Sequence, residues 1–259
     1  MIPRIGLGTW PLQGDEAHRV VAEAIGLGYT HVDTAQMYGN EAAVGQGIRA
    51  SGQDVFVTTK VHHDRFADGT ARESAERSRD ALGRIDLLLV HWPPRGLPLA
   101  RVIEEMAEIR AAGLCRLIGV SNFNRPQLRA AAAMTEIATN QVEYHLLIDQ
   151  SPLKAVADEL GIPLTAYQPI AKGRVFDLPA VRLAAARHGR TPAEVAIAWI
   201  LAQNVIAIPK SARRENLAAN LAAADLTLAP EEVVTLTALT HGHRRFVDPA
   251  DWAPDWDAA

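Results

Sequence analysis

Residues 86–121, DLLLVHWPPRGLPLARVIEEMAEIRAAGLCRLIGVS, contain the pattern that decides the fold. Two short apolar runs, Asp86–His91 and Leu117–Ser121, flank a longer stretch in which apolar and charged residues mix. The runs are too short for helices, and their continuous apolar character is typical of strands buried on both faces of a parallel sheet. The longer stretch has the pattern of a helix. The segment therefore predicts a strand–helix–strand unit.

The same unit recurs along the chain after an opening β segment at Arg4–Trp10. Further strands are expected at Tyr29–Asp33, Val55–Lys60, Thr139–Glu143, Leu164–Tyr167 and Val205–Lys210, with a weaker eighth near Leu226–Leu228. An eight-stranded α/β barrel needs about 250 residues, and the chain has 259. We therefore predict a single-domain (β/α)8 TIM barrel over residues 1–259, and a doubly wound open sheet is the alternative.

Four helix starts carry local signals. Thr70 with Glu73, and Thr191 with Glu194, have the spacing of capping boxes. Pro152 after Ser151 suits the first turn of a helix, and Asn40 is expected to cap another.

The last residues, 241–259, have prolines and tryptophans but few helix signals. We expect this irregular tail, with Trp252 and Trp256, to pack back over the barrel mouth as a flap. A purely structural clamp is the alternative.

Composition excludes several classes of function. The 26 basic and 30 acidic side chains leave a net charge of −4, which gives no field for binding nucleic acid or an anionic membrane. One cysteine, Cys115, excludes an internal disulfide and suggests a reducing compartment. Pro3, Gly6 and Gly8 interrupt the apolar start, so no signal peptide is expected. We expect a cytoplasmic monomer that acts on a small molecule.

Polar residues end nearly every predicted strand, and barrel active sites are built at the carboxyl ends of the strands. These residues are Asp33, Lys60, His91, Ser121, Asn122, Gln141, Tyr167 and Lys210. Any buried strand can end in polar residues as it approaches solvent. Seven such ends, with Asp, Lys, His and Tyr among them, favour an active site.

Four of the residues suit chemistry at a carbonyl group. Asp33 and Lys60 end adjacent strands and are expected to form an ion pair, and Tyr38 lies on the loop above them. A nearby ammonium is expected to lower the pKa of Tyr38 and make it a better proton donor. His91 is placed to orient a carbonyl oxygen. The set fits protonation of that oxygen while its carbon accepts a nucleophile or hydride.

A hydride needs a carrier, and two groups of residues fit a nicotinamide cofactor. Ser121, Asn122 and Gln141 can hold a carboxamide, and the ring of Tyr167 can stack on the nicotinamide. The basic residues after the last strand fit a phosphate clamp: Lys210, Ser211, Arg213 and Arg214.

At these positions the chain resembles the aldo-keto reductase family almost end to end. The motifs that carry the resemblance are Gly28–Glu41, Thr59–Lys60, Leu89–Pro93, Ile118–Phe123, Asn140–Glu143 and Ile208–Ser211. The size and the tail are most similar to a small prokaryotic branch that includes 2,5-diketo-gluconate reductases and methylglyoxal reductases. The resemblance implies NADPH-dependent carbonyl reduction with Asp33, Tyr38, Lys60 and His91 as the catalytic tetrad.

The resemblance also implies binding residues. For the cofactor these are Thr9, Trp10, Ser121, Asn122, Gln141, Tyr167, Gln168, Ile170, Lys210, Ser211, Arg213, Arg214 and Asn220, and for the substrate Trp10, His62 and Trp92. Where the family usually has an arginine, six residues after Lys210, this chain has Asn216. Use of NADH therefore stays open. His62 replaces a tryptophan that many members have, so the substrate is not carried over.

Other motifs are interpreted as structural. Gly45, Gly47 and Ala50 match a loose dinucleotide fingerprint, but they lie within a predicted helix rather than at a strand-to-helix turn. His62, His63 and Asp64, and the pair His241 and His243, lack further ligands at zinc-like spacing, so no metal is expected. Cys115 precedes an apolar strand and is expected to be a small buried hydrophobe.

Two other functions remain as alternatives. Lys60 at a strand end is compatible with a Schiff-base lyase, although pairing with Asp33 would make it a poor nucleophile. The barrel is also compatible with a non-catalytic protein that binds a nicotinamide cofactor and reports redox state.

Overall fold

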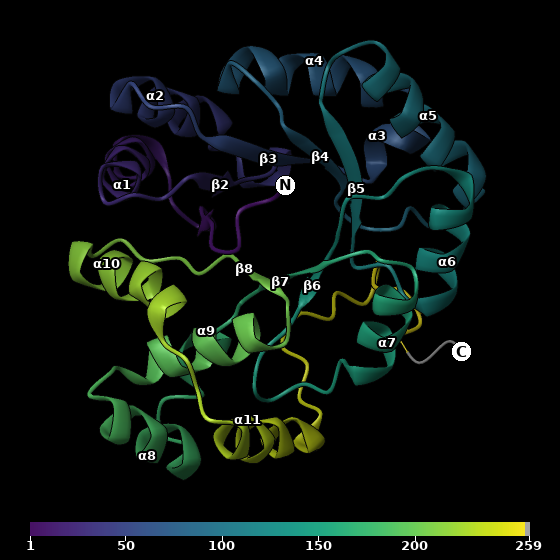
Figure 1. Ribbon diagram of the computed structural model, residues 1–259. Coiled ribbons are helices and arrows are strands. Elements are labelled where there is room, and N and C mark those ends of the chain that lie inside the picture. The colour runs from purple at the N-terminus through teal and green to yellow at the C-terminus, as the bar shows by residue number, and fades with distance from the viewer. Residues whose placement is uncertain (257–259) are drawn as a thin grey trace.

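Eight parallel strands form the centre of the molecule, and helices surround them (Figure 1). The structure is a computed structural model in which residues 1–256 are described. Its strands are β1 (Leu7–Gly8), β2 (His31–Asp33), β3 (Phe56–Val61), β4 (Leu87–Val90), β5 (Leu117–Ser121), β6 (Asn140–Glu143), β7 (Leu164–Tyr167) and β8 (Ile206–Ala207). Each strand pairs with the next one along the chain.

The sheet closes between its first and last strands. Ile5, just before β1, forms a parallel bridge with Ala207 of β8. The amide of Gly6 donates to the carbonyl of Ala207 at 2.9 Å, and the amide of Ala207 donates to the carbonyl of Arg4 at 2.9 Å. The predicted single-domain (β/α)8 barrel is therefore confirmed, and the open-sheet alternative is wrong.

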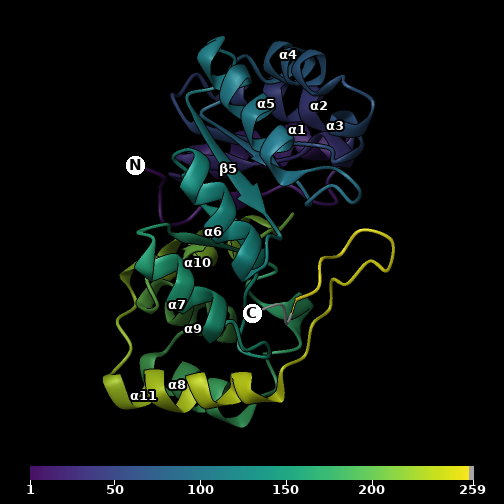
Figure 2. The same ribbon diagram turned by 90° about the vertical axis from the view of Figure 1, so that its right-hand side faces the viewer.

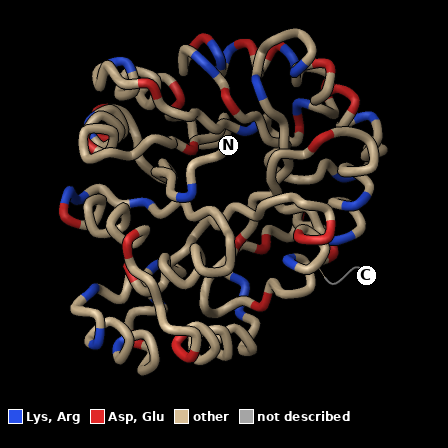
Figure 3. Tube along the Cα trace, in the orientation of Figure 1, with Lys and Arg blue, Asp and Glu red and all other residues tan. Residues whose placement is uncertain are grey.

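The helices form the outer layer of the barrel. The α-helices are α1 (Gly14–Gly26), α2 (Glu41–Ser51), α3 (Asp64–Ala67), α4 (Ala71–Leu82), α5 (Leu99–Ala111), α6 (Arg125–Met134), α7 (Ser151–Glu159), α8 (Pro179–His188), α9 (Pro192–Ala202), α10 (Arg214–Ala222) and α11 (Pro230–Thr237). Short 3-10 helices are η1 (Gln36–Tyr38), η2 (Ala171–Gly173), η3 (Ala223–Asp225) and η4 (Ala238–Gly242). Figure 3 shows acidic and basic positions interspersed around this layer.

Two strand predictions need correction. The first barrel strand, β1, lies inside the opening segment, whereas Leu226–Leu228 lies between η3 and α11 and forms no strand. The Leu228 side chain packs into the core beneath the helices, which explains the apolar pattern. The close approach of strands at β1 requires Gly8, because a Cβ there would lie 2.6 Å from the carbonyl oxygen of Ile208.

The helix starts differ in how they are capped. The Thr191–Glu194 capping box is present at α9, and α7 begins at Ser151 as predicted. The Thr70 box is wrong: its side chain makes no cap hydrogen bond and donates to Asp68 instead. Asn40 precedes α2 but turns its side chain to the carbonyls of Thr9 and Leu12, where it ties the β1 loop to the β2 loop.

The glycine motif at residues 45–50 lies within a helix, as the sequence predicts, and its role is helix packing. It lies within α2, and a Cβ on Gly45 would sit 2.0 Å from the carbonyl oxygen of Ala81. A Cβ on Gly47 would meet the carbonyl of His18 at 2.6 Å. Both glycines therefore allow α2 to pack closely between its neighbours α4 and α1.

The barrel interior is apolar at one end and polar at the other. Near the amino ends of the strands the interior is filled by a cluster of Ile2, Phe56, Leu87, Leu89 and Ile206. Above it lie buried hydroxyl and imidazole groups, such as the Thr139–Thr165 pair at 2.8 Å. Further along β2 and β3 lie the buried charged groups Asp33 and Lys60. The layering directs the chemistry to the carboxyl ends of the strands.

The tail after η4 lies on the side of the molecule toward which the β5 arrow points (Figure 2). Trp252 packs on His63 and Trp92, with ring centroids 4.8 and 5.4 Å apart, and Trp256 lies 6.0 Å from Trp92. The last part of the expected flap, residues 257–259, lies outside the described residues. Among residues 1–256, no helix is both long enough and apolar enough to cross a membrane.

Candidate active site

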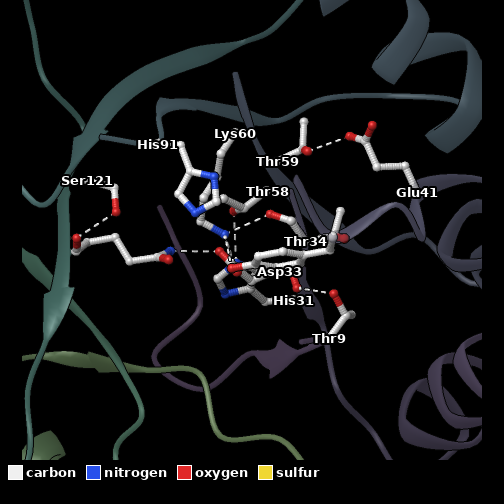
Figure 4. A network of polar contacts seen from close by, with 12 residues as sticks. Thr9, His31, Asp33, Thr34, Glu41, Thr58, Thr59, Lys60, His91 and Ser121 are labelled. Carbon is white, nitrogen blue, oxygen red and sulfur yellow. Dashed lines mark hydrogen bonds and ion pairs between the residues drawn. The ribbon is translucent and has the colours of Figure 1, made fainter. Parts of the chain in front are cut away.

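A buried ion pair lies at the centre of the polar end of the barrel (Figure 4). As the sequence predicts, Lys60 of β3 meets Asp33 of β2, with Nζ 2.6 Å from Oδ1. Nζ also donates to the carbonyl of Thr34 at 2.7 Å. Burial lowers the pKa of Lys60, but Asp33 and Tyr38 outweigh it, and the net direction is upward. Lys60 is therefore an ammonium group.

Tyr38 lies on η1, with its hydroxyl 3.5 Å from Nζ of Lys60. Burial raises the pKa of Tyr38 above its ordinary value, while the charge of Lys60 acts in the opposite direction. The expectation from the sequence that the pKa of Tyr38 is lowered is wrong in net direction. It included the effect of the Lys60 ammonium but not the larger, opposite effect of desolvation. Tyr38 is thus a protonated phenol beside a cation.

A residue that sequence reasoning missed holds η1 in place. The Gln36 amide donates to Ser78 of α4 at 3.0 Å and accepts from the His62 amide at 3.0 Å. These contacts link the Tyr38 segment to α4 and to the loop after β3. A glutamine two residues before the tyrosine gives no signal of this function in the sequence.

His91 follows β4 and faces Tyr38, with ring centroids 5.7 Å apart. Burial, with a smaller contribution from the charge of Lys60, holds the pKa of His91 well below its ordinary value. Its imidazole is therefore neutral at pH 7 and carries one N–H donor. Among the described residues, its Nδ1 is buried without a hydrogen-bond partner.

The amide-bearing residues expected to hold a carboxamide meet beside the ion pair. Gln141 donates from Nε2 to Oδ2 of Asp33 at 2.7 Å. The Asn122 side chain donates to Ser121 Oγ and accepts from the Tyr167 hydroxyl at 2.8 Å. The structure therefore brings together Ser121, Asn122, Gln141 and Tyr167, and in it they bond to one another and to Asp33.

The segment after β7 carries a buried polar atom. Gln168 has a φ of 51°, and among the described residues its Oε1 is buried without a hydrogen-bond partner. Ile170 precedes η2 and is half-buried. On the opposite side, Thr9 is buried and donates to the carbonyl of Asp33 at 3.0 Å. Trp10 is 55% exposed and packs on Tyr38 with ring centroids 5.2 Å apart.

The basic cluster after β8 is only partly directed to a phosphate. The hydroxyl of Ser211 accepts from the Arg213 amide at 3.2 Å, just before α10. Arg214 turns outward to Glu23 of α1, with an N–O distance of 3.3 Å. Lys210 is half-buried, and Asn220 is buried on α10. Lys210 and Arg213 are thus better placed than Arg214 for a clamp at the start of α10.

Aromatic rings line the other side of the mouth. Trp92 is 4% exposed, and the rings of His62 and His63 stack with centroids 4.3 Å apart. Burial lowers the pKa of both histidines. The sequence predicted a substrate role for His62 but none for His63, which stacks on Trp252. The tail tryptophans, together with Trp92 and His62, were the signals for this wall in the sequence.

Comparison with known proteins agrees with this geometry. The sequence profile of the aldo/keto reductase family matches residues 4–241. The chain belongs to this family. It is therefore an oxidoreductase that reduces carbonyl groups, and the aldo-keto reductase resemblance seen in its motifs is confirmed.

Individual aldo-keto reductases are similar over nearly the full length. A methylglyoxal reductase DkgB of Salmonella typhimurium is 38% identical over 99% of this chain and 99% of its own. A crystal structure of a protein proposed to be a 2,5-diketo-D-gluconic acid reductase B has 42% identity and a TM-score of 0.95, covering 99% and 94% of the two chains. A Bombyx mori aldo-keto reductase in complex with NADP has 29% identity and a TM-score of 0.90, covering 99% and 95%.

Proposed function

We propose that the chain reduces small aldehydes and ketones to alcohols with NADPH, on substrates such as methylglyoxal or 2,5-diketo-gluconate. The observation that carries the proposal is the contact series from Asp33 through Lys60 to Tyr38, with neutral His91 opposite. The names of the relatives support the substrate class.

The residues beside the tetrad fit a nicotinamide cofactor. Ser121, Asn122 and Gln141 supply amide and hydroxyl groups, and the unpartnered Oε1 of Gln168 supplies a buried acceptor for a carboxamide N–H. The ring of Tyr167 supplies a stacking surface, with Thr9, Trp10 and Ile170 nearby. Lys210, Ser211 and Arg213 supply charge and donors for a phosphate, and Asn220 lies on α10, which directly follows them. When bound, reduced nicotinamide supplies a hydride to the carbonyl carbon.

The tetrad controls the proton in this reaction. Tyr38 holds the proton that passes from its hydroxyl to the carbonyl oxygen, and the ammonium of Lys60 stabilises the phenolate that remains. Asp33 holds Lys60 in its charged form and in position. The neutral imidazole of His91 donates a hydrogen bond that orients the carbonyl. Trp10, Trp92 and His62 exclude water around the substrate.

The central test is Tyr38→Phe. Removal of the proton donor is expected to reduce kcat by about 10²–10⁴-fold with methylglyoxal and NADPH, without loss of NADPH binding measured by fluorescence. Tyr144→Phe is the matched control, because Tyr144 is also buried but packs against Trp199, away from the tetrad. An inactive wild type on a panel of aldehydes and keto acids would overturn the proposal.

Preference between NADPH and NADH is proposed to depend on Arg213. Arg214 is paired with Glu23 of α1, whereas the guanidinium of Arg213 donates to the Asn216 side-chain oxygen at 2.9 and 3.2 Å on α10, where a 2′-phosphate can also accept from it. Arg213→Ala is expected to raise KM for NADPH about tenfold and leave that for NADH unchanged. Arg214→Ala is the control and should change neither value by more than about twofold. Equal effects of the two variants would contradict the assignment.

The contacts of Lys60 argue against the alternative function as a Schiff-base lyase. Its Nζ is an ammonium within reach of Asp33, Thr34 and Tyr38, and a protonated amine is not a nucleophile.

We also propose a cytoplasmic monomer. Cys115 is buried and unpaired, which suits a reducing compartment. Large apolar side chains with high exposure, such as Met134 of α6 and Leu183 of α8, lie on elements far apart in the barrel (Figure 1).

A further inference from the structure

A buried carboxylate outside the tetrad bonds to the tail. Glu143 ends β6, two residues after Gln141, and its side chain is 0% exposed. Its Oε1 accepts from the Phe246 amide at 2.8 Å, and its Oε2 accepts from the Val247 amide at 2.9 Å. The barrel thus holds the tail by its backbone, at a position about 100 residues away in sequence.

A histidine completes this site. Nε2 of His145 lies 2.9 Å from Oε1 of Glu143, and Nδ1 accepts from the Leu147 amide at 3.2 Å. Because Nδ1 accepts, the proton of the neutral imidazole is on Nε2 and points to the carboxylate. The Glu143 carboxylate therefore accepts three hydrogen bonds, from His145 Nε2 and from the amides of Phe246 and Val247. All three need acceptor oxygens, which a carboxylate supplies.

Beyond this point the tail leads to the aromatic wall. Val247 is followed within nine residues by Trp252 and Trp256, whose rings contact Trp92. Trp92 directly follows His91. The far part of the tail is held separately, since Arg95 donates to the carbonyl of Ala253 at 2.7 Å. Glu143 therefore fixes the near end of a strap whose middle carries Trp252.

The anchored segment lies beyond the family's common sequence pattern. The family profile ends at residue 241, whereas the amides that Glu143 holds belong to Phe246 and Val247. Phe246 is also held by its ring, which packs 5.3 Å from His145 and lies under the guanidinium of Arg174 at 4.4 Å.

We propose that Glu143 is a positioning residue that anchors the tail at the barrel mouth and thereby sets the substrate wall formed by Trp252 and Trp256. The effect on substrate rests on the proposed function, whereas the anchoring of the tail rests on the hydrogen bonds of Glu143 alone.

The test changes each side of the anchor separately. Glu143→Gln replaces one acceptor oxygen with an NH₂ group, which cannot accept from an amide N–H, so at least one of the three bonds is lost. Val247→Pro removes one tail donor and leaves the barrel side chain intact. Asp86→Asn is the matched control: Asp86 is a buried carboxylate that accepts from the Val57 amide at 2.9 Å, at the amino end of β4.

Hydrogen exchange of the tail and KM for two aldehydes are the measurements that test the proposal. Hydrogen exchange of residues 244–256 is expected to accelerate about tenfold or more in both anchor variants and to stay at the wild-type rate in Asp86→Asn. KM for a ring-bearing aldehyde, 4-nitrobenzaldehyde, is expected to rise about five- to tenfold, with kcat and the KM for methylglyoxal within about twofold. A merely structural role would not separate the two substrates.

The outcomes separate the two proposals. Unchanged exchange in both variants would overturn the anchor. Faster exchange with unchanged KM for 4-nitrobenzaldehyde in an active enzyme would overturn its effect on substrate. A wild type without reductase activity would overturn the proposed function and the substrate wall, whereas the exchange data would still decide the anchor.

Discussion

The catalytic tetrad shows what can be inferred for single residues. Asp33 and Lys60 could be paired from the sequence because both end neighbouring parallel strands, whose carboxyl ends meet at one edge. The direction in which the pKa of Tyr38 shifts could not be inferred from the sequence. Burial depends on the surrounding side chains, and here its effect on the pKa outweighs that of the nearby charge. The contact of Gln141 with Asp33 was also hidden, since it crosses the barrel between strands that are not neighbours.

Lys60→Met is expected to destabilise the fold strongly. It leaves the carboxylate of Asp33 buried without its cation, and removing one partner of such a pair lowers the free energy of unfolding by about 3–5 kcal/mol. Urea unfolding measures this change. Lys154→Met is the control, because Lys154 pairs with Asp158 on the surface and should lose less than about 1 kcal/mol. Equal losses in the two variants would show that the Asp33–Lys60 pair does not stabilise the barrel.

Strands and helices were predicted with different success for physical reasons. Strands β3, β4, β5 and β7 could be located because they are mainly apolar runs buried on both faces, whereas β2 and β6 are buried but carry polar residues and were located by their place in the repeating strand–helix order. The two-residue strands β1 and β8 lie inside the longer predicted segments Arg4–Trp10 and Val205–Lys210, so their ends could not be located, and Leu226–Leu228 is apolar because it packs under helices. Thr191 and Thr70 have the same capping-box spacing, but a nearby Asp68 takes the Thr70 hydroxyl. The capping-box spacing alone cannot predict this hydrogen bond to Asp68, because it depends on the geometry of the loop before the helix.

Gly45→Ala is expected to disrupt the packing of α2 on α4. The new Cβ would lie 2.0 Å from the Ala81 carbonyl oxygen, so the helices must move apart. Overpacking of this kind lowers the free energy of unfolding by about 1–3 kcal/mol or more. Gly26→Ala in α1 is the control: no atom lies within 4 Å of its added Cβ, and the change should be neutral or stabilising. Chemical denaturation compares the two, and a neutral Gly45→Ala would contradict the close packing.

At the scale of the whole molecule, the barrel is a gradient from apolar to charged along its axis. The cluster around Phe56 fills one end, and Asp33 with Lys60 occupies the other. The order of the strands follows from the alternation of short apolar runs with helical stretches along the sequence. The tail was expected at the barrel mouth because of its tryptophans, but its individual contacts could not be predicted, because they are single rings and backbone hydrogen bonds rather than a repeating pattern.

The buried His31 is expected to make the molecule less stable in acid. Burial lowers its pKa to about 4. Between pH 6.5 and 4 the unfolded chain binds a proton that the folded barrel does not, so the free energy of unfolding falls as the pH falls, by up to about 3 kcal/mol. Urea unfolding at pH 7 and pH 4.5 measures the loss. His31→Gln should reduce it, whereas the exposed His241→Gln should not; identical losses in all three proteins would contradict the prediction.

The closure of the barrel also constrains how it folds. The pairing of Ile5 with Ala207 joins two ends of the chain, as does the hydrogen bond from Arg4 to the carbonyl of Leu201, 197 residues later. All other strand pairs join consecutive units, so they can form early from short loops. On a ribosome adding about 5–20 residues per second, the first strand waits on the order of ten to forty seconds for its last partner. We expect pulse-labelling hydrogen exchange to show the amides of Gly6 and Gly8 protected last, and early protection there would mean that the ends meet before the middle is built.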